Sequence, residues 1–281
     1  MHKFAQVPMD DHPRGMPPLT IGVLGVGALA SAVVTGLCEG VDDAPPVVLS
    51  PRGAEAGARL TQAYPSVVVA GDNQEVLDRA DVVLVCLRLR DADLLADLDW
   101  RPGQTVVSAV AGLTGADLAA AVAPASQVAR AVPMVATAQR AWATPLRPDL
   151  PAAREVFERT GGVVAVGSDE QFDAVATALG TVAPFFDYLA TVARFLVDHG
   201  MPQADADRLL GQSFAHVAAP LAQDGLDMQE LLRGHATPGG GNEQLATLLR
   251  QAGVPEATRA GLDEIFRRQT GGAYEADSSD G

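Results

Sequence analysis

Two glycines and an alanine near the start of the chain have the spacing of a dinucleotide-binding turn. The segment Thr20–Cys38 begins with the apolar run Ile21–Leu24, continues as Gly25-x-Gly27-x-x-Ala30 and ends in small apolar residues. The first glycine permits a tight turn, the second lets a pyrophosphate approach the backbone, and the alanine keeps a helix close to the strand. The phosphates would bind the unpaired N–H groups at the helix N-terminus. The pattern predicts a bound dinucleotide, with an ordinary glycine-rich turn as the alternative.

The end of the second expected strand carries a hydroxyl and a guanidinium where a carboxylate is common. After Val47-Val48-Leu49 the chain reads Ser50-Pro51-Arg52. A site that prefers NAD usually has Asp or Glu here to bind the ribose hydroxyls, whereas arginine can form forked, charge-assisted bonds to a 2′-phosphate. We therefore predict NADP(H) as the cofactor. The alternative is an arginine on a solvated loop.

The scarcity of lysine narrows the chemistry further. The single lysine, Lys3, lies in the N-terminal tail. This disfavours mechanisms that need an active-site lysine, which include Schiff-base chemistry, the Tyr–Lys pair of short-chain dehydrogenases and the catalytic lysine of β-hydroxyacid dehydrogenases.

Composition sets the broad class of protein. The 281 residues are 48% hydrophobic, and the net charge of −15 with a pI near 4.6 argues against nucleic acid or an anionic membrane as the main partner. Cys38 and Cys86 lie in apolar segments without metal-ligand spacing, so we expect buried free thiols and no metal. We identify no apolar run of the roughly 18 residues that span a bilayer, and no signal peptide. We expect a cytoplasmic protein.

Alternating strand and helix patterns then predict the scaffold that positions these residues. Helices are expected after the glycine turn, over 54–63 and from Thr114, with Asn73 at the start of another. The alternation is typical of a doubly wound parallel sheet, that is, of an α/β Rossmann-type domain. Strands are expected at 21–24, 47–49, 67–70, 82–87, 105–108, 127–132 and 163–166.

Beyond residue 168 the pattern becomes purely helical. Large apolar faces without further strands favour an all-helical domain that forms a dimer. The expected helices cover 168–197, 204–222, 228–232, 243–251 and 255–268. The predicted organisation is a flexible tail (1–19), a dinucleotide-binding domain (20–167), a helical dimerisation and substrate domain (168–270) and a disordered tail (271–281).

In their shared order and spacing, six segments between Thr20 and Arg268 resemble motifs of the pyrroline-5-carboxylate reductase family. They are IGVLGVGALA, LVCLRL, SAVAGLT, QVARAVPM, HGMPQADADRLLGQ and ATPGGGNEQLATLLRQAG. The resemblance implies an NAD(P)H-dependent reductase that transfers hydride to a cyclic C=N bond, with a Rossmann domain and a helical domain that interlocks between two subunits. By position it implies cofactor contacts at Gly25, Val26, Gly27, Ala28, Leu29, Ser50, Arg52, Asn73, Cys86, Leu87, Arg88, Ala109, Val110 and Ala111.

The departures from the family pattern fall on the substrate side. Where the family has Ser-Gly-Ser-Gly-Pro-Ala-Tyr, this chain keeps only Thr181 as a partial replacement for the serines, and Phe185 stands near the tyrosine. Met134 replaces the asparagine after the family's Met-Pro, and Gly241 with Asn242 replaces its paired threonines. An amino-acid carboxylate would be poorly paired beside Met, Val and Phe, and a buried unpaired charge is costly. We therefore expect an imine other than, or broader than, pyrroline-5-carboxylate.

The candidate catalytic residues are Asn242, Thr237 and Thr181. Asn242 could hydrogen-bond the substrate nitrogen, with a helix N-cap as the alternative. His235, Tyr188 and Asp187 are further candidate proton donors, but a loop histidine and a polar interruption at a dimer interface explain them more simply. An iminium substrate arrives protonated, so a strong general acid is not required.

Three functions remain open at this point. The first is an NADPH-dependent reductase of a small cyclic imine, acting as a homodimer. The second is a reductase of a small carbonyl compound on the same scaffold. The third is a dimeric protein that binds NADP(H) without catalysis, which the loss of the family's serines and threonines favours.

Overall fold

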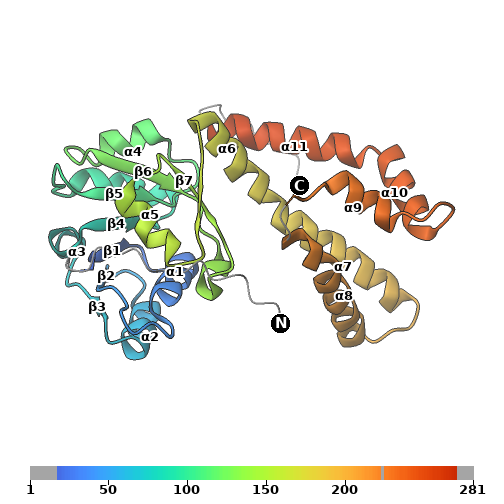
Figure 1. Cartoon of the computed structure of the whole chain (residues 1–281), viewed down its shortest axis with the longest axis horizontal. Helices are drawn as coiled ribbons and strands as arrows, with labels where there is room; N and C mark the ends of the chain where they lie inside the picture. The colour runs from blue at the N-terminus through green and yellow to red at the C-terminus, as the bar shows by residue number, and fades with distance from the viewer. Residues whose placement is uncertain (1–17, 223–224, 271–281) are drawn as a thin grey trace, which may run out of the picture. The chain divides into compact units, whose positions relative to one another are not determined.

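Eight short strands form one mixed sheet in the computed structural model, which describes residues 18–222 and 225–270 (Figure 1). The strand order is β3-β2-β1-β4-β5-β6-β7-β8, and every neighbouring pair is parallel except β6 and β7. The strands are β1 (Ile21–Leu24), β2 (Val47–Leu49), β3 (Val67–Val69), β4 (Val82–Val85), β5 (Thr105–Ser108), β6 (Gln127–Ala131), β7 (Thr144–Arg147) and β8 (Val163–Ala165). The predicted α/β class is confirmed.

Strand alternation gives the sheet two apolar faces. Val23 and Leu84 belong to one core cluster, whereas their neighbours Leu24 and Val85 belong to the other. Successive side chains of a strand point to opposite faces, so a run of apolar residues is buried on both sides. The helices that cover the sheet are α1 (Ala28–Cys38), α2 (Ala54–Ala63), α3 (Asn73–Arg79), α4 (Gly115–Ala121) and α5 (Pro151–Glu158), with 3₁₀ segments η1 (Leu89–Asp97) and η2 (Val135–Gln139).

One strand was not predicted. β7 carries Pro145 and ends in Arg147, so it has neither the apolar run nor the alternation that marks a strand in the sequence. It runs antiparallel to β6, and the N–H of Val132 donates to the Pro145 carbonyl at 3.0 Å. A proline is tolerated because it accepts in this ladder and does not have to donate.

The remaining helices form a second compact unit, and the two units divide between Phe172 and Asp173. The expected bounds 20–167 and 168–270 stay a prediction, and the predicted tails lie outside the described residues apart from Pro18 and Leu19. The predicted helix over 168–197 is interrupted by a 3₁₀ turn. The elements are α6 (Asp169–Ala178), η3 (Leu179–Thr181), α7 (Val182–Asp198), α8 (Gln203–Ala218), η4 (Ala219–Ala222), α9 (Met228–His235), α10 (Gly241–Gln251) and α11 (Val254–Gln269).

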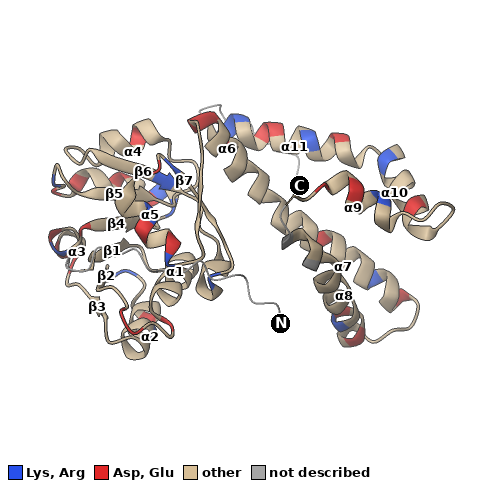
Figure 2. Cartoon of the chain, in the orientation of Figure 1, with Lys and Arg blue, Asp and Glu red and all other residues tan. Residues whose placement is uncertain are grey.

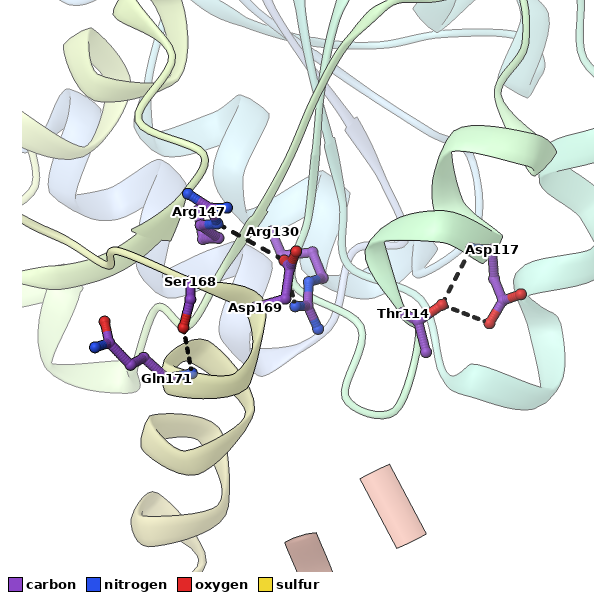
Figure 3. Close-up of polar contacts among 7 residues, drawn as sticks. All are labelled: Thr114, Asp117, Arg130, Arg147, Ser168, Asp169 and Gln171. Atoms are coloured by element: carbon purple, nitrogen blue, oxygen red, sulfur yellow. Dashed lines mark hydrogen bonds and ion pairs between the residues drawn. The ribbon is translucent and has the colours of Figure 1, made fainter. Parts of the chain in front are cut away.

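The first turn of α6 is anchored by Arg130 of β6, an inner strand of the sheet (Figure 3). Nη2 of the buried Arg130 lies 2.9 Å from Oδ1 of Asp169, and its guanidinium lies 4.4 Å from the ring centre of Phe172. Ser168 accepts from the N–H of Gln171 at 3.1 Å, as the prediction that Ser168 caps this helix requires. The sequence at the start of α6 therefore specifies both where the helix begins and what holds it.

The helical unit has almost no core of its own. In the described part of 173–270, only Thr177, Ala193 and Ala206 are buried. Along α7, Phe186 is 61% and Phe195 59% exposed, and Figure 2 shows few charges on this helix compared with α11. Apolar faces of this extent normally pack against something.

The run Asp169–Asp198 also corrects an expectation. By length and composition it could cross a membrane, although the sequence analysis identified no such segment. Only 6% of its most apolar window is buried within the chain. A single helix of this kind is weak evidence for a membrane span, because the apolar face of a subunit interface meets the same criteria.

Replacing Gly36 by alanine should destabilise the sheet unit. Gly36 lies inside α1, where an added Cβ would overlap the backbone carbonyl oxygen of Thr137 in η2. We expect a loss of about 2 kcal/mol, typical of overpacking a tight contact. The two tryptophans, Trp100 and Trp142, both lie in this unit, so urea unfolding followed by tryptophan fluorescence reports on it alone.

The matched control is Gly103→Ala. An added Cβ there meets nothing within 4 Å, so this variant should unfold at the wild-type urea concentration. A wild-type midpoint for Gly36→Ala would contradict the close packing of α1 against η2.

Candidate functional site

The carboxyl ends of β1, β2, β4 and β5 meet at one edge of the sheet. In the order β3-β2-β1-β4-β5, the chain moves outward from β1 in one direction and then returns to the other side through β4. A crevice forms outside the strands at such a reversal, and ligands of open α/β sheets bind there. The predicted cofactor residues follow these strand ends, except Asn73, which begins α3 after the edge strand β3.

The glycine turn after β1 leaves the N-terminus of α1 open. Gly27 is the N-cap and Ala28 the first helical residue; both are exposed, whereas Val26 is buried. No side chain caps this helix, its first turn contains no acidic residue, and an added Cβ on Gly27 would meet nothing within 4 Å. Free N–H groups and the positive end of the helix dipole face this open space, which suits a pyrophosphate.

The loop after β4 packs against the same turn. Gly25 has a φ of +89°, and an added Cβ would lie 2.8 Å from the carbonyl oxygen of Cys86. This is why glycine is required here. The residue Cys86 is partly exposed, but the burial of its thiol raises its pKa to about 12, so the thiol stays protonated and is not a nucleophile at neutral pH. Leu87 and Arg88 follow, and Arg88 is exposed.

The loop after β2 completes the turn from the other side. Ser50 is 2% exposed, and its Oγ accepts from the N–H of Gly25 at 2.9 Å. The N–H of Val26 donates to the Arg52 carbonyl at 3.4 Å, and an added Cβ on Gly53 would overlap the Val26 carbonyl oxygen. In this structure Ser50 therefore supports the backbone of the glycine turn, and the side chain that extends from this loop is that of Arg52.

The sequence analysis missed a carboxylate beside Arg52. Nη2 of Arg52 lies 3.0 Å from Oδ2 of Asp91, which belongs to η1 after β4. No local sequence pattern distinguishes Asp91, because it lies among other charged residues in RLRDAD. The signal that could have found it is the strand order, because β2 and β4 flank β1 and their following loops must come together there.

The third predicted contact segment follows β5. The N–H of Ala109 donates to the Val85 carbonyl at 2.9 Å, and Ser108 Oγ accepts from Val110 at 3.1 Å. Ala111 is exposed. The next helix begins at Thr114, whose Oγ1 accepts from the N–H of Asp117 at 3.1 Å, as predicted for its N-cap (Figure 3). These residues and the glycine turn fit a dinucleotide, since the backbone is open to phosphate and one arginine lies beside it.

The candidate catalytic residues lie in the helical unit. Asn242 is in the first turn of α10, where Gly240 and not Asn242 is the N-cap. Its Nδ2 donates to the His235 carbonyl at 3.0 Å, which leaves Oδ1 to accept another bond. Thr237 belongs to the same loop, and its carbonyl accepts from the N–H of Gly240 at 2.9 Å. The structure therefore places Thr237 in the loop just before α10 and Asn242 in the first turn of that helix.

Thr181 lies on another element of the helical unit. It ends η3, and its Oγ1 donates to the Ala178 carbonyl at 2.7 Å. His235 is the last residue of α9 and not a loop residue as predicted, and its imidazole Nδ1 lies 2.8 Å from the Leu231 carbonyl of the same helix. Tyr188 and Asp187 are exposed on α7. Across residues 18–222 and 225–270, no group of three His, Cys, Asp or Glu side chains could hold a metal ion.

Two family models match separate parts of the chain. The model described as NADP oxidoreductase, coenzyme F420-dependent, matches residues 20–112, which include the glycine turn and β5. The model described as pyrroline-5-carboxylate reductase dimerisation matches residues 169–271, which begin with α6. The first match lies within the sheet unit, and the second covers the helices from α6 onward.

Whole-chain relatives agree with these matches. The pyrroline-5-carboxylate reductase of Corynebacterium melassecola is 28% identical over 250 residues, which are 84% of this chain and 92% of the relative. The crystal structure of the Streptococcus pyogenes 1-pyrroline-5-carboxylate reductase has a TM-score of 0.74 at 20% identity, covering 90% of this chain and 98% of that one.

A third relative was solved with a cofactor. The Plasmodium falciparum pyrroline carboxylate reductase with NADP bound has a TM-score of 0.73 at 13% identity, covering 91% of this chain and 98% of that one. At these identities the solved structures establish the fold. Together with the open glycine turn, the two family models and the relatives support a member of the pyrroline-5-carboxylate reductase family and indicate an NAD(P)H-dependent oxidoreductase.

Proposed function

We propose that this protein is an NADPH-dependent reductase that transfers hydride to the C=N bond of a small cyclic imine. The observation that carries the proposal is the uncapped N-terminus of α1 beside an exposed Gly27, in a chain whose relatives are named pyrroline-5-carboxylate reductases. When bound, the reduced nicotinamide supplies the hydride. Every other requirement falls on this chain's own residues.

We assign cofactor binding to residues that follow the carboxyl ends of the strands. The backbone from Gly25 to Leu29 would bind the pyrophosphate, and Arg52 would bind the 2′-phosphate. The segments Cys86–Arg88 and Ala109–Ala111, together with Asn73, would line the rest of the dinucleotide. Three observations support this assignment: the segments after β1, β2 and β4 are in mutual contact, Arg52 is the side chain that extends from the β2 loop, and a reductase of similar fold was solved with NADP.

Positioning the imine is assigned to Asn242, Thr237 and Thr181. A protonated imine nitrogen carries an N–H, and it needs an acceptor rather than an acid. Asn242 offers Oδ1 for this role because its Nδ2 is already held by the His235 carbonyl. The chain has Met134 and Phe185 at two positions where the family has polar residues, so we propose imines without a carboxylate, or with one held elsewhere, as substrates.

We further propose that the protein works as a homodimer through its helical unit. The dimerisation model matches residues 169–271, and α7 exposes large aromatic side chains. The cytoplasmic location stays a prediction.

Two other functions remain as outcomes of the tests. Reduction of a small carbonyl compound uses the same cofactor site. Cofactor binding without catalysis has a specific observation in its favour: Asn242 Nδ2 and Thr181 Oγ1 both bond to backbone carbonyls of their own segments. A panel of pyrroline-5-carboxylate, pyrroline-2-carboxylate, piperideine-carboxylates, uncharged cyclic imines and small carbonyls separates the three functions by NADPH oxidation.

Replacing Arg52 by glutamine should remove the preference for NADPH over NADH. The loss of a forked contact to phosphate should weaken NADPH binding about tenfold or more, while NADH binding changes little. Titration of cofactor fluorescence measures both dissociation constants. Equal losses for the two cofactors would show that Arg52 does not recognise the 2′-phosphate.

Replacing Asn242 by alanine should lower kcat for the imine about tenfold, the effect of removing one hydrogen bond to a reacting group, and leave NADPH binding unchanged. Gln244→Ala, an exposed change in the same turn of α10, is the matched control and should behave as the wild type. Turnover by Asn242→Ala at the wild-type rate would remove Asn242 from the site.

Replacing Phe186 by aspartate should shift the protein from dimer to monomer. A charge placed at a buried apolar contact between subunits would be desolvated without a partner. Light scattering coupled to size-exclusion chromatography gives the mass, and circular dichroism checks that the variant folds. Val68→Asp, on the edge strand β3, makes the same change away from the helical unit. A folded Phe186→Asp chain of wild-type mass would contradict the assigned interface.

A further inference from the structure

The ion pair between Arg52 and Asp91 crosses the carboxyl end of β1. Arg52 follows β2 and Asp91 follows β4, and these strands pair with opposite edges of β1. The glycine turn leaves β1 between them, and its Val26 contacts the Arg52 backbone. The 3.0 Å contact therefore lies beside the glycine turn, where the 2′-phosphate site is predicted.

The two partners differ in their exposure to solvent. The Asp91 side chain is only 21% exposed and sits on η1, which is packed through the buried Ala92 and Leu95. The Arg52 side chain is 59% exposed. The carboxylate is therefore the less solvated partner, and the guanidinium lies at the end of a long side chain that is mostly exposed.

We propose that Asp91 is a specificity-determining residue that limits the preference for NADPH over NADH by competing for Arg52. This inference rests on the proposed role of Arg52 in binding the 2′-phosphate. Asp91 acts through Arg52 and through its own charge, and it is a positioning residue rather than a catalytic one.

The charges decide the direction of the effect. A phosphate monoester carries about −1.5 to −2 charges at neutral pH, so a fixed carboxylate a few ångströms behind Arg52 repels it and neutralises part of the attraction. A ribose 2′-hydroxyl carries no charge and is not repelled. Asp91 therefore weakens NADPH binding more than NADH binding. By holding the Arg52 side chain in one position, Asp91 could also strengthen NADPH binding. This contribution is small, because fixing one exposed side chain gains little free energy.

The test uses fragments that fill only the adenosine side. Adenosine 2′,5′-bisphosphate carries the 2′-phosphate and 5′-AMP lacks it, and isothermal titration measures both affinities without any turnover. Asp91→Asn keeps the shape of the side chain and removes its charge. Asp93→Asn is the matched control, because it makes the same charge change on the same segment at an exposed carboxylate.

We expect Asp91→Asn to bind adenosine 2′,5′-bisphosphate about threefold to tenfold more tightly at low salt, with 5′-AMP unchanged. The gain should shrink as ionic strength rises, because salt screens the repulsion, and a purely structural change would not show this. Asp93→Asn should bind both fragments as the wild type does. In an Arg52→Gln background, the part of the gain that comes from competition for the guanidinium should disappear, and only the part that comes from repulsion by the Asp91 charge, which salt screens, should remain.

The outcomes separate this inference from the cofactor assignment. If Arg52→Gln binds adenosine 2′,5′-bisphosphate as well as the wild type does, Arg52 does not bind the 2′-phosphate, and both its assigned role and the competition by Asp91 are wrong. If Arg52→Gln loses affinity but Asp91→Asn leaves it unchanged or lowers it, competition by Asp91 is wrong and the cofactor assignment stands. A loss for both fragments in Asp91→Asn would place Asp91 in direct contact with adenosine and overturn the proposal. If Asp93→Asn gains as much affinity for adenosine 2′,5′-bisphosphate as Asp91→Asn does, the gain comes from the net charge of the protein and the proposed role of Asp91 is wrong.

Discussion

The unsatisfied N–H groups at the start of α1 are the constraint on which the rest of the site depends. A helix end that points into open space, with an exposed Gly27 and no capping side chain, leaves donors that water or a ligand must satisfy. Three segments keep this end open and rigid. Ser50 holds the Gly25 amide, the Cys86 carbonyl packs where a Cβ would be, and Gly53 brings the Arg52 loop against Val26. The proposed anion site is thus formed by backbone, and side chains are expected only to select among the anions that fit it.

The helical unit buries few of its apolar side chains within a single chain. In its described part only three residues are buried, so it lacks the core that would stabilise helices of this length alone. The apolar side chains of α7 could instead be buried against a second subunit. The candidate substrate residues lie on two elements of this unit, Thr181 at the end of η3 and Asn242 at the start of α10. Dimerisation and substrate binding are therefore expected to be linked.

The sequence predicted best what local patterns encode. The glycine spacing located the turn from Gly25 to Ala30, apolar runs located β1, β4 and β5, and Thr114 marked a helix start. Contacts between loops that are distant in the sequence could not be predicted from local patterns. Asp91 looks like any other charge in an acidic chain, and only the placement of β2 and β4 on either side of β1 pairs it with Arg52.

Three other features were missed or misinterpreted for related reasons. β7 lacks the apolar alternation that marks a strand, because its pairing with β6 depends on tertiary context and tolerates Pro145. Ser50 was interpreted as facing the cofactor, but its hydroxyl bonds to the Gly25 backbone in a buried position, which residue type alone does not distinguish. Asn242 was considered as an N-cap, but the N-cap of α10 is Gly240, two residues earlier in the chain.

The measurement that tests the central claim most directly is the transfer of deuterium from NADPH labelled at C4 of the nicotinamide to a cyclic imine. Mass spectrometry and NMR of the amine product locate the label. If the protein is an imine reductase of the proposed kind, one deuterium appears on the carbon of the former C=N bond, from only one of the two faces of the nicotinamide. An amine without deuterium at that carbon, or no amine from any imine of the panel while NADPH still binds, would contradict the account.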